Sequence, residues 1–157
     1  MIKLALILNI NGKSRYIRCY DESCIDEECM QNTVDETIHN VVIKEIFQKL
    51  KNRKMQDWNI IEDLDSLKDG HRIIYRKYAT LFFVFVVDDG ENELAMIDLI
   101  QNCVQLLEKN FPDVCEYHLV FNPDLLYSIM DEVVMDGMVT EINIKEIHDN
   151  VQSLYDD

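Results

Sequence analysis

The sequence predicts an α+β domain in which one largely antiparallel β-sheet is packed by helices. Three observations lead to this prediction: a hairpin signal near the N-terminus, a run of seven consecutive apolar residues in mid-chain, and long segments with helical periodicity. The expected order of elements is ββ-α-βββ-α-α, with a further short helix at the end. A length of 157 residues suits one domain, so residues 1–157 are expected to form a single unit.

The chain opens with a predicted β-hairpin. Residues 2–8 have the apolar content of a strand, and residues 15–20 alternate between side-chain types. Between them lies Asn11-Gly12, two residues that accept positive φ, which is a strong short-range hairpin signal.

An acidic stretch at residues 21–31 precedes the first predicted helix. Apolar residues recur at helical spacing from Val34 to Leu50. A basic cluster lies where this helix should end, and its charge complements the helix dipole. The cluster either contacts a partner or is an ordinary solvated helix end; it consists of Lys49, Lys51, Arg53 and Lys54.

Three further strands are predicted. Residues 58–61 form a short strand, residues 62–70 a polar loop, and residues 72–75 the next strand. The run from Leu81 to Val87 is apolar on both faces, so its strand is expected to be central or covered twice.

The helix predicted at residues 92–109 has a wide apolar surface. Its polar side chains form one narrow stripe, while apolar side chains from Leu94 to Leu107 cover the remaining circumference. A helix that lies on one sheet needs an apolar stripe of only about 100°. The excess therefore requires a second covering surface, either a later helix of the same chain or a foreign polypeptide.

Two more helices are predicted towards the C-terminus. Asn122-Pro123 suits a helix start, with Asn as the N-cap and Pro in the first turn, and Gly137 suits its end. Asn143 and Glu146 resemble a capping box for a last helix that reaches Leu154.

The charge balance excludes several classes of function. The chain carries 30 acidic and 15 basic residues, a net charge of −15. Such a surface repels nucleic acid and also opposes a direct grip on anionic lipid. The longest apolar run, from Leu81 to Val87, is far shorter than the roughly 20 residues of a spanning helix. Because the first residues also lack a signal-peptide pattern, we expect a cytosolic protein without a membrane segment.

The sequence offers no pattern typical of catalysis or of a metal site. The four glycines stand apart, so no phosphate-binding loop is predicted. The four histidines are scattered, no serine has a nucleophile-elbow context, and the five cysteines follow no zinc spacing. We expect reduced, mostly buried thiols, no cofactor and no metal.

Several segments, taken together, resemble the small (sigma) chains of heterotetrameric clathrin-type adaptor-protein complexes. The resemblance covers most of the chain, and residues 21–70 match least. It rests on residues 11–15 (NGKSR), 73–83 (IIYRKYATLFF), 91–94 (ENEL), Phe111, 114–116 (VCE), 119–122 (LVFN) and 131–135 (DEVVM). The sigma subunit of the third adaptor complex is the most similar type, on residues 78–85 (YATLFFVF), 99–101 (LIQ), 133–141 (VVMDGMVTE) and an insertion before His71.

This resemblance implies a longin-like fold: a five-stranded antiparallel sheet with helices on both faces. It also implies a heterotetramer with a large adaptin (delta-type favoured), a beta-type large chain and a medium chain. Such complexes sort cargo in vesicle-mediated transport, peripherally on Golgi, endosomal and coated-vesicle membranes. Membrane contact is then indirect, through the complex.

The resemblance further implies a site for acidic dileucine signals in cargo tails. One wall is expected from Tyr78, Ala79, Leu81 and Phe83, and the other from Val104, Val114, Tyr117 and Leu119. Arg15 matches the basic residue that meets the acidic side chain of the signal. The chain departs from the family pattern at Asp113, which adds a negative charge, and at Tyr117, which is bulkier than the usual leucine.

Two other interpretations stay open on the sequence alone. One is another longin-type trafficking module: the sigma chain of a different adaptor complex, a coatomer small subunit or a tethering subunit. A SNARE regulatory domain is disfavoured, because we expect no downstream heptad-repeat helix. The other is a small acidic enzyme, which would require a catalytic constellation of Asp and His side chains in a deep pocket.

Overall fold

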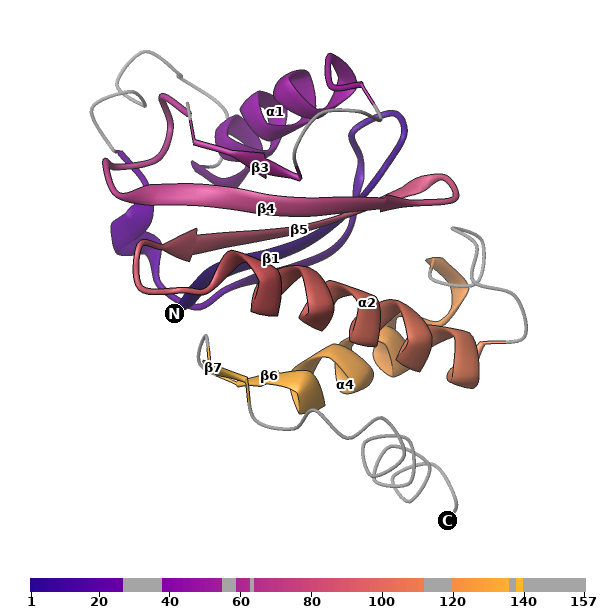
Figure 1. The fold of residues 1–157 in the computed structure, drawn as a ribbon. Coiled ribbons are helices and arrows are strands. Elements are labelled where there is room, and N and C mark those ends of the chain that lie inside the picture. The colour runs from indigo at the N-terminus through magenta and orange to yellow at the C-terminus, as the bar shows by residue number, and fades with distance from the viewer. Residues whose placement is uncertain (27–37, 55–58, 63, 112–119, 136–137, 140–157) are drawn as a thin grey trace.

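The computed structural model describes residues 1–26, 38–54, 59–62, 64–111, 120–135 and 138–139. Its centre is a five-stranded antiparallel sheet in the order β2-β1-β5-β4-β3 (Figure 1). The five-stranded antiparallel sheet predicted from the sequence is therefore confirmed. The strands are β1 (Ile2–Asn9), β2 (Ser14–Cys19), β3 (Ile60–Ile61), β4 (His71–Tyr78) and β5 (Leu81–Asp88).

Helices cover both faces of this sheet, as a longin-like fold requires (Figure 1). Helix α1 (Ile38–Lys51) lies on one face, and helices α2 (Glu93–Asn110) and α4 (Pro123–Val133) lie on the other. We call these the α1 face and the α2 face. A short 3₁₀ helix, η1 (Glu22–Cys24), follows β2.

The two central strands supply apolar side chains to both faces. In β5, Leu81, Phe83 and Phe85 enter the core under α2, whereas Phe82, Val84 and Val86 enter the core under α1. Strand β1 divides in the same way, with Ala5 on the α2 face and Leu6 on the α1 face. This period-2 alternation explains the continuous apolar run: β5 is central and is covered twice, as predicted.

The hairpin between β1 and β2 forms around the predicted Asn11-Gly12 turn. The side-chain oxygen of Asn9 accepts hydrogen bonds from the backbone N–H groups of Asn11 and Lys13, both at 2.9 Å. Gly12 has a φ of +84° and packs so closely on Phe47 of α1 that a Cβ atom there would lie 2.7 Å from the ring. The turn therefore requires glycine for its conformation and for its contact.

The wide apolar surface of α2 is covered mostly by the chain itself. Asn92 caps the helix by accepting from the N–H groups of Leu94 (3.0 Å) and Ala95 (3.2 Å). Side chains such as Ile100 and Leu106 are fully buried between the sheet and α4. Leu94, in the first turn, stays 74% exposed. The sequence left two candidates for covering the excess apolar surface of this helix, a later helix of the same chain or a foreign polypeptide. The later helix, α4, covers the larger part.

Contacts to the edge strand β2 hold α4 in place. The guanidinium of Arg18 donates to both carboxylate oxygens of Asp131 at 3.2 and 3.0 Å and stacks on the Tyr127 ring at 4.8 Å. The backbone N–H of Ile17 donates to the Tyr127 hydroxyl at 3.3 Å. Helix α4 thus satisfies part of an exposed sheet edge.

Two predicted boundaries are wrong. The helix that starts at Pro123 was expected to reach Gly137 but ends at Val133. Val134 is extended and begins β6 (Val134–Met135), which pairs with β7 (Met138–Val139). β-branched residues suit a strand as well as a helix face, so the apolar pattern did not reveal the change. Strand β4 runs past Tyr75 to Tyr78, because Arg76 and Lys77 still pair with β5 although their side chains are polar.

Some predictions lie outside the described residues. These are the start of the first helix at Val34, the strand position of Trp58 and the last helix at residues 143–154.

Candidate functional site

The first predicted wall lies at the turn between β4 and β5. Tyr78 ends β4 and pairs with Leu81, the first residue of β5. Ala79, between them, is exposed and has a φ of +53°. Leu81 and Phe83 alternate with Phe82, so both enter the core on the α2 face.

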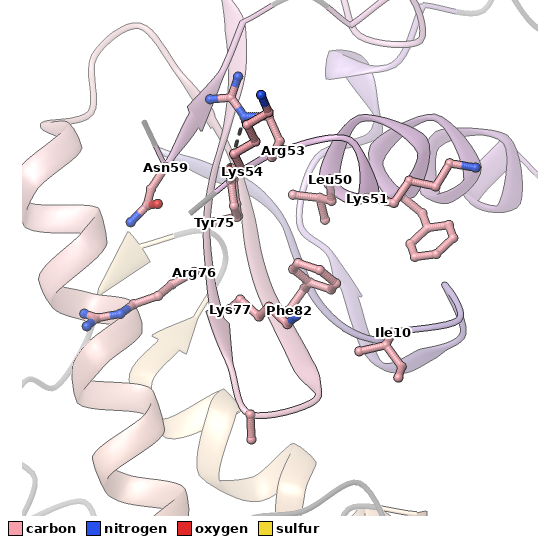
Figure 2. A pocket seen from close by; sticks show the side chains of 12 residues that line it. Ile10, Leu50, Lys51, Arg53, Lys54, Asn59, Tyr75, Arg76, Lys77 and Phe82 are labelled. Carbon is pink, nitrogen blue, oxygen red and sulfur yellow. Dashed lines mark hydrogen bonds between the residues drawn. The ribbon is translucent and has the colours of Figure 1, made fainter. Parts of the chain in front are cut away.

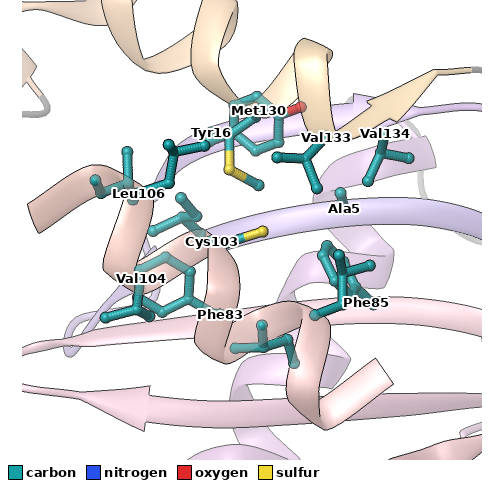
Figure 3. Packing of buried hydrophobic residues seen from close by; sticks show 14 of the residues in the cluster. Ala5, Tyr16, Phe83, Phe85, Cys103, Val104, Leu106, Met130, Val133 and Val134 are labelled. Atoms are coloured by element: carbon teal, nitrogen blue, oxygen red, sulfur yellow. The ribbon is translucent and has the colours of Figure 1, made fainter. Parts of the chain in front are cut away.

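The second predicted wall is represented by Val104 of α2. Its side chain is 1% exposed and belongs to the same cluster as Leu81 and Phe83, with Tyr78 packed against that cluster. Figure 3 shows Val104 and Phe83 within this packing, beneath Cys103 and Leu106. The fold therefore brings Tyr78, Leu81, Phe83 and Val104 together, although Val104 is distant from the others in the sequence.

A hydrogen bond joins the tip of the β4–β5 hairpin to α2. The hydroxyl of the half-buried Tyr78 donates to Oε1 of Glu108, one helical turn beyond Val104. This contact places the Tyr78 ring between the exposed turn and the helix. The tyrosine thus stands at the border between the buried cluster and solvent.

The other predicted site residues are placed differently. Arg15 lies half-buried in the edge strand β2, at the position where the pairing with β1 shifts from Leu8–Ser14 to Ile7–Tyr16. Strand β1 separates it from β5. Val114, Tyr117 and Leu119 lie outside the described residues, as does Asp113.

Side chains that could act as metal ligands or nucleophiles occur in several elements of the described residues. In these parts of the chain, no three His, Cys, Asp or Glu side chains gather in a way that could hold a metal ion. Cys19, Cys24 and Cys103 are free thiols, and burial raises the pKa of Cys24 to about 11 and that of Cys103 to about 12. Such thiols stay protonated near neutral pH and are poor nucleophiles.

None of the helices within the described ranges combines the length and the apolar character needed to cross a membrane.

A groove on the α1 face was missed by the sequence analysis (Figure 2). It has a volume of about 740 Å³ and lies between the C-terminal end of α1, the β1–β2 turn and the strands β4 and β5. The basic cluster at residues 49–54 indicated one of its walls, but no pattern connected this cluster with Arg76 and Lys77. Ala79, predicted for the dileucine site, also borders this groove.

Comparison with known proteins points to one family. The family model described as "Clathrin adaptor complex small chain" matches residues 1–157. The chain is similar to the AP-3 complex subunit sigma-2 of Homo sapiens, with 44% identity over 94% of this chain and 71% of that protein. It is also similar to the AP-3 complex subunit sigma of Dictyostelium discoideum, with 40% identity over 97% and 84% of the two chains.

A structural comparison agrees with the sequence comparison. The fold is similar to a chain of a "homology model of the full-length AP-3 complex in a stretched open conformation", with a TM-score of 0.69 and 30% identity. The match covers 99% of this chain and 94% of that one.

Proposed function

The chain belongs to the family of clathrin adaptor complex small chains, and from this premise we propose that it binds a large adaptin and helps to bind acidic dileucine sorting signals. Its type is that of the third adaptor complex, since its relatives are named as AP-3 sigma subunits. It is a non-enzymatic subunit of a vesicle-transport adaptor.

The proposed assembly is a heterotetramer. In it, residues 1–157 act as one longin-like domain that binds a delta-type large adaptin, next to a beta-type large chain and a medium chain. The complex would act in the cytoplasm, peripherally on Golgi, endosomal and coated-vesicle membranes. With a net charge of −15, this chain needs its partners for contact with an anionic membrane. The exposed side chains of Leu94 and Phe121 are candidates for contacts with the large chain.

One observation carries the cargo-binding proposal: Tyr78, Leu81, Phe83 and Val104 meet in one cluster at the tip of the β4–β5 hairpin. Leu81, Phe83 and Val104 are at most 2% exposed, so in the proposed site the two leucines enter beside the half-buried Tyr78 and the exposed Ala79, next to this cluster. Each leucine gains roughly 1.5–3 kcal/mol on burial, before the cost of ordering the peptide. The result is weak, reversible capture, which is what a transport adaptor needs.

Arg15 is proposed to contact the acidic side chain of the signal. In a chain with twice as many acidic as basic residues, a local cation is required for such a contact. A half-exposed ion pair contributes only about 0–1 kcal/mol, so Arg15 would act on specificity more than on affinity.

The pocket is tested by pull-down of the assembled complex on immobilised dileucine peptide. We expect Val104→Asp to abolish binding, because a carboxylate in this apolar cluster opposes the leucines. Unchanged binding by a complex that contains Val104→Asp refutes the pocket. Since Val104 is almost fully buried, co-elution of the variant with the large chains is the control for folding.

Arg15 provides a second variant with less risk for the fold. Arg15→Glu is expected to weaken binding of the acidic signal, and Arg15→Lys to retain most of it. A peptide with Gln in place of its acidic residue should no longer distinguish the two variants. Equal binding of the acidic peptide by both variants removes Arg15 from the site.

The adaptin partner is tested separately. The tagged chain is purified from its own cells, and co-eluting proteins are identified by mass spectrometry. We expect two large chains and one medium chain; a chain that elutes alone contradicts the proposed assembly.

A further inference from the structure

The groove on the α1 face has the size of a ligand site. Its volume of about 740 Å³ falls within the range of roughly 300–1,000 Å³ that is typical of ligand pockets. Much of its lining comes from α1 and from side chains on the α1 face, such as Tyr75 and Phe82, whereas Val104 is buried in the core under α2. The groove therefore differs from the proposed dileucine site, although the two share Ala79 at the tip of the β4–β5 hairpin.

The charge of the groove is opposite to that of the chain. Five of the 15 basic residues line it, and none of its described lining residues is acidic. The helix dipole accounts for cations at the end of α1, but not for Arg76 and Lys77, which come from β4. The basic lining residues are Lys51, Arg53, Lys54, Arg76 and Lys77.

The cations are arranged around aromatic side chains of the groove. The Nζ atom of Lys51 lies 5.9 Å from the centre of the Phe47 ring, and that of Lys77 lies 5.7 Å from the centre of the Phe82 ring. Arg53 is anchored, since its Nε donates to the Tyr75 hydroxyl at 3.2 Å and its Nη2 to the Ile60 carbonyl at 3.1 Å.

Three of the cations have no carboxylate partner within the described part of the chain: Lys51, Arg76 and Lys77. All three are exposed, so an external anion can reach them. Lys51 and Lys77 lie over aromatic rings of the groove, whereas the Arg76 side chain extends towards α2 at the border of the groove (Figure 2). Their charges can therefore pair with a ligand without first breaking an internal ion pair.

The same groove also offers apolar surface. Ile10, in the β1–β2 turn, is 49% exposed, and the half-buried Phe47 faces the groove from α1. Figure 2 shows Ile10 and Phe82 on the same side of the groove as the end of α1. An apolar side chain placed among these residues would remove exposed hydrophobic surface from water.

We propose that this groove binds a short acidic segment of a partner polypeptide, in which carboxylates flank one aromatic or large aliphatic side chain. Carboxylates match the rim of cations, and the apolar side chain matches Ile10, Phe47 and Phe82. An anionic membrane is a poorer occupant, because the surface as a whole has a net charge of −15 and is repelled by it. A phosphate ion would leave the apolar part of the groove unused.

The test measures fluorescence anisotropy of a labelled peptide, Glu-Glu-Asp-Phe-Glu-Asp-Glu, with the purified full chain. We expect binding that weakens markedly between about 50 mM and about 300 mM salt, where screening lengths fall from about 14 to about 6 Å. The combined substitutions Lys51→Glu and Lys77→Glu should weaken it at least about tenfold. Both residues are exposed, so the fold should persist, which circular dichroism checks.

Matched controls separate the groove from general charge effects. Lys109→Glu makes the same kind of charge change on exposed α2 and should leave peptide binding unchanged. A peptide with Ser in place of Phe should bind more weakly. Equal loss with Lys109→Glu, or equal affinity of the Ser peptide, overturns the proposal.

Two further measurements distinguish an acidic peptide from a lipid headgroup or free phosphate as the ligand of the groove. Binding of anionic vesicles or of inorganic phosphate, but not of the peptide, overturns the proposal in favour of a lipid or phosphate site. Peptide binding by the free chain that is lost in the assembled complex supports it and assigns the segment to another subunit. The groove substitutions should leave the dileucine pull-down unchanged, so this proposal and the cargo proposal can fail independently.

Discussion

The two faces of the sheet are closed to different degrees. Within the described residues, helices of 18 and 11 residues cover the α2 face, whereas α1, described from Ile38 to Lys51, covers the α1 face. The groove lies at the C-terminal end of α1, where residues of the β1–β2 turn and of β4 and β5 complete its lining.

The two faces of the sheet therefore have different roles, one in packing the core and one in lining an open groove. On the α2 face, apolar side chains of the chain itself fill the space between the sheet and the helices. On the α1 face, packing stops at a rim of cations and leaves room for another molecule. A central strand such as β5, apolar on both sides, supports both roles at once.

The largest predicted effect is on the free energy of unfolding, when one buried leucine on each face is replaced by alanine. Leu106 of α2 is fully buried in the core of the α2 face, while Leu50 of α1 is buried but borders the groove. Leu106→Ala should cost roughly 3–5 kcal/mol in free energy of unfolding, because its cavity is enclosed. Leu50→Ala should cost roughly 2–3 kcal/mol, since groove water can reach the space. Urea denaturation followed by circular dichroism measures both; a larger loss for Leu50→Ala contradicts the comparison.

A smaller effect is predicted where the β1–β2 turn closes the α1 face. Gly12→Ala places a Cβ atom 2.7 Å from the Phe47 ring in a backbone with positive φ. We expect a loss of about 2–4 kcal/mol in free energy of unfolding, from strain and overpacking together. Gly70→Ala is the matched control: its φ is also positive, but its nearest neighbour is the flexible end of Asp89. It should lose only about 1–2 kcal/mol.

A double variant, Gly12→Ala with Phe47→Leu, separates the cost of the contact with the Phe47 ring from the cost of the turn conformation. Phe47→Leu should restore part of the stability lost in Gly12→Ala, because the smaller side chain can move away. The same substitution should not help Gly70→Ala. Equal rescue of both glycine variants would show that turn strain, rather than the contact with α1, sets the cost.

Strands and turns that carry a clear local side-chain pattern were predictable from the sequence. The alternation along β5 places Leu81 and Phe83 on one face, and the Asn11-Gly12 turn pairs β1 with β2. The boundaries that failed lie where the side-chain pattern and the backbone pairing diverge. Arg76 and Lys77 are polar, but their backbones continue the ladder with β5.

The groove was not predictable for a different reason. Its cations come from the end of α1 and from β4, which only the tertiary fold brings together. For the dileucine site, family resemblance supplied the residues, and period 2 supplied the shared face of Leu81 and Phe83. Neither could supply the burial of Val104, which depends on how α2 and α4 pack.

The smallest predicted effect concerns η1, which helps to close the α1 face because its Cys24 enters that core. Asp21 caps η1: its carboxylate accepts from the N–H of Ser23 at 2.9 Å and pairs with Lys3 at 2.9 Å. The hydrogen bond from Ser23, followed by that from Lys3, lowers the pKa of Asp21 below its usual value. Because the charged carboxylate makes these contacts more strongly than the neutral acid, the extra stabilisation is present above the unfolded pKa of about 3.9 and is lost as the pH falls through the folded pKa.

Asp21→Asn should therefore melt below the wild type at pH 7, and the two melting temperatures should converge as the pH falls below about 4. Thermal unfolding between these pH values measures the difference. Asp69→Asn, in an exposed loop, is the control for removing one negative charge from a chain of net charge −15. A gap between wild type and Asp21→Asn that widens towards acid would mean that Asp21 opposes, rather than supports, the closure of the α1 face by η1.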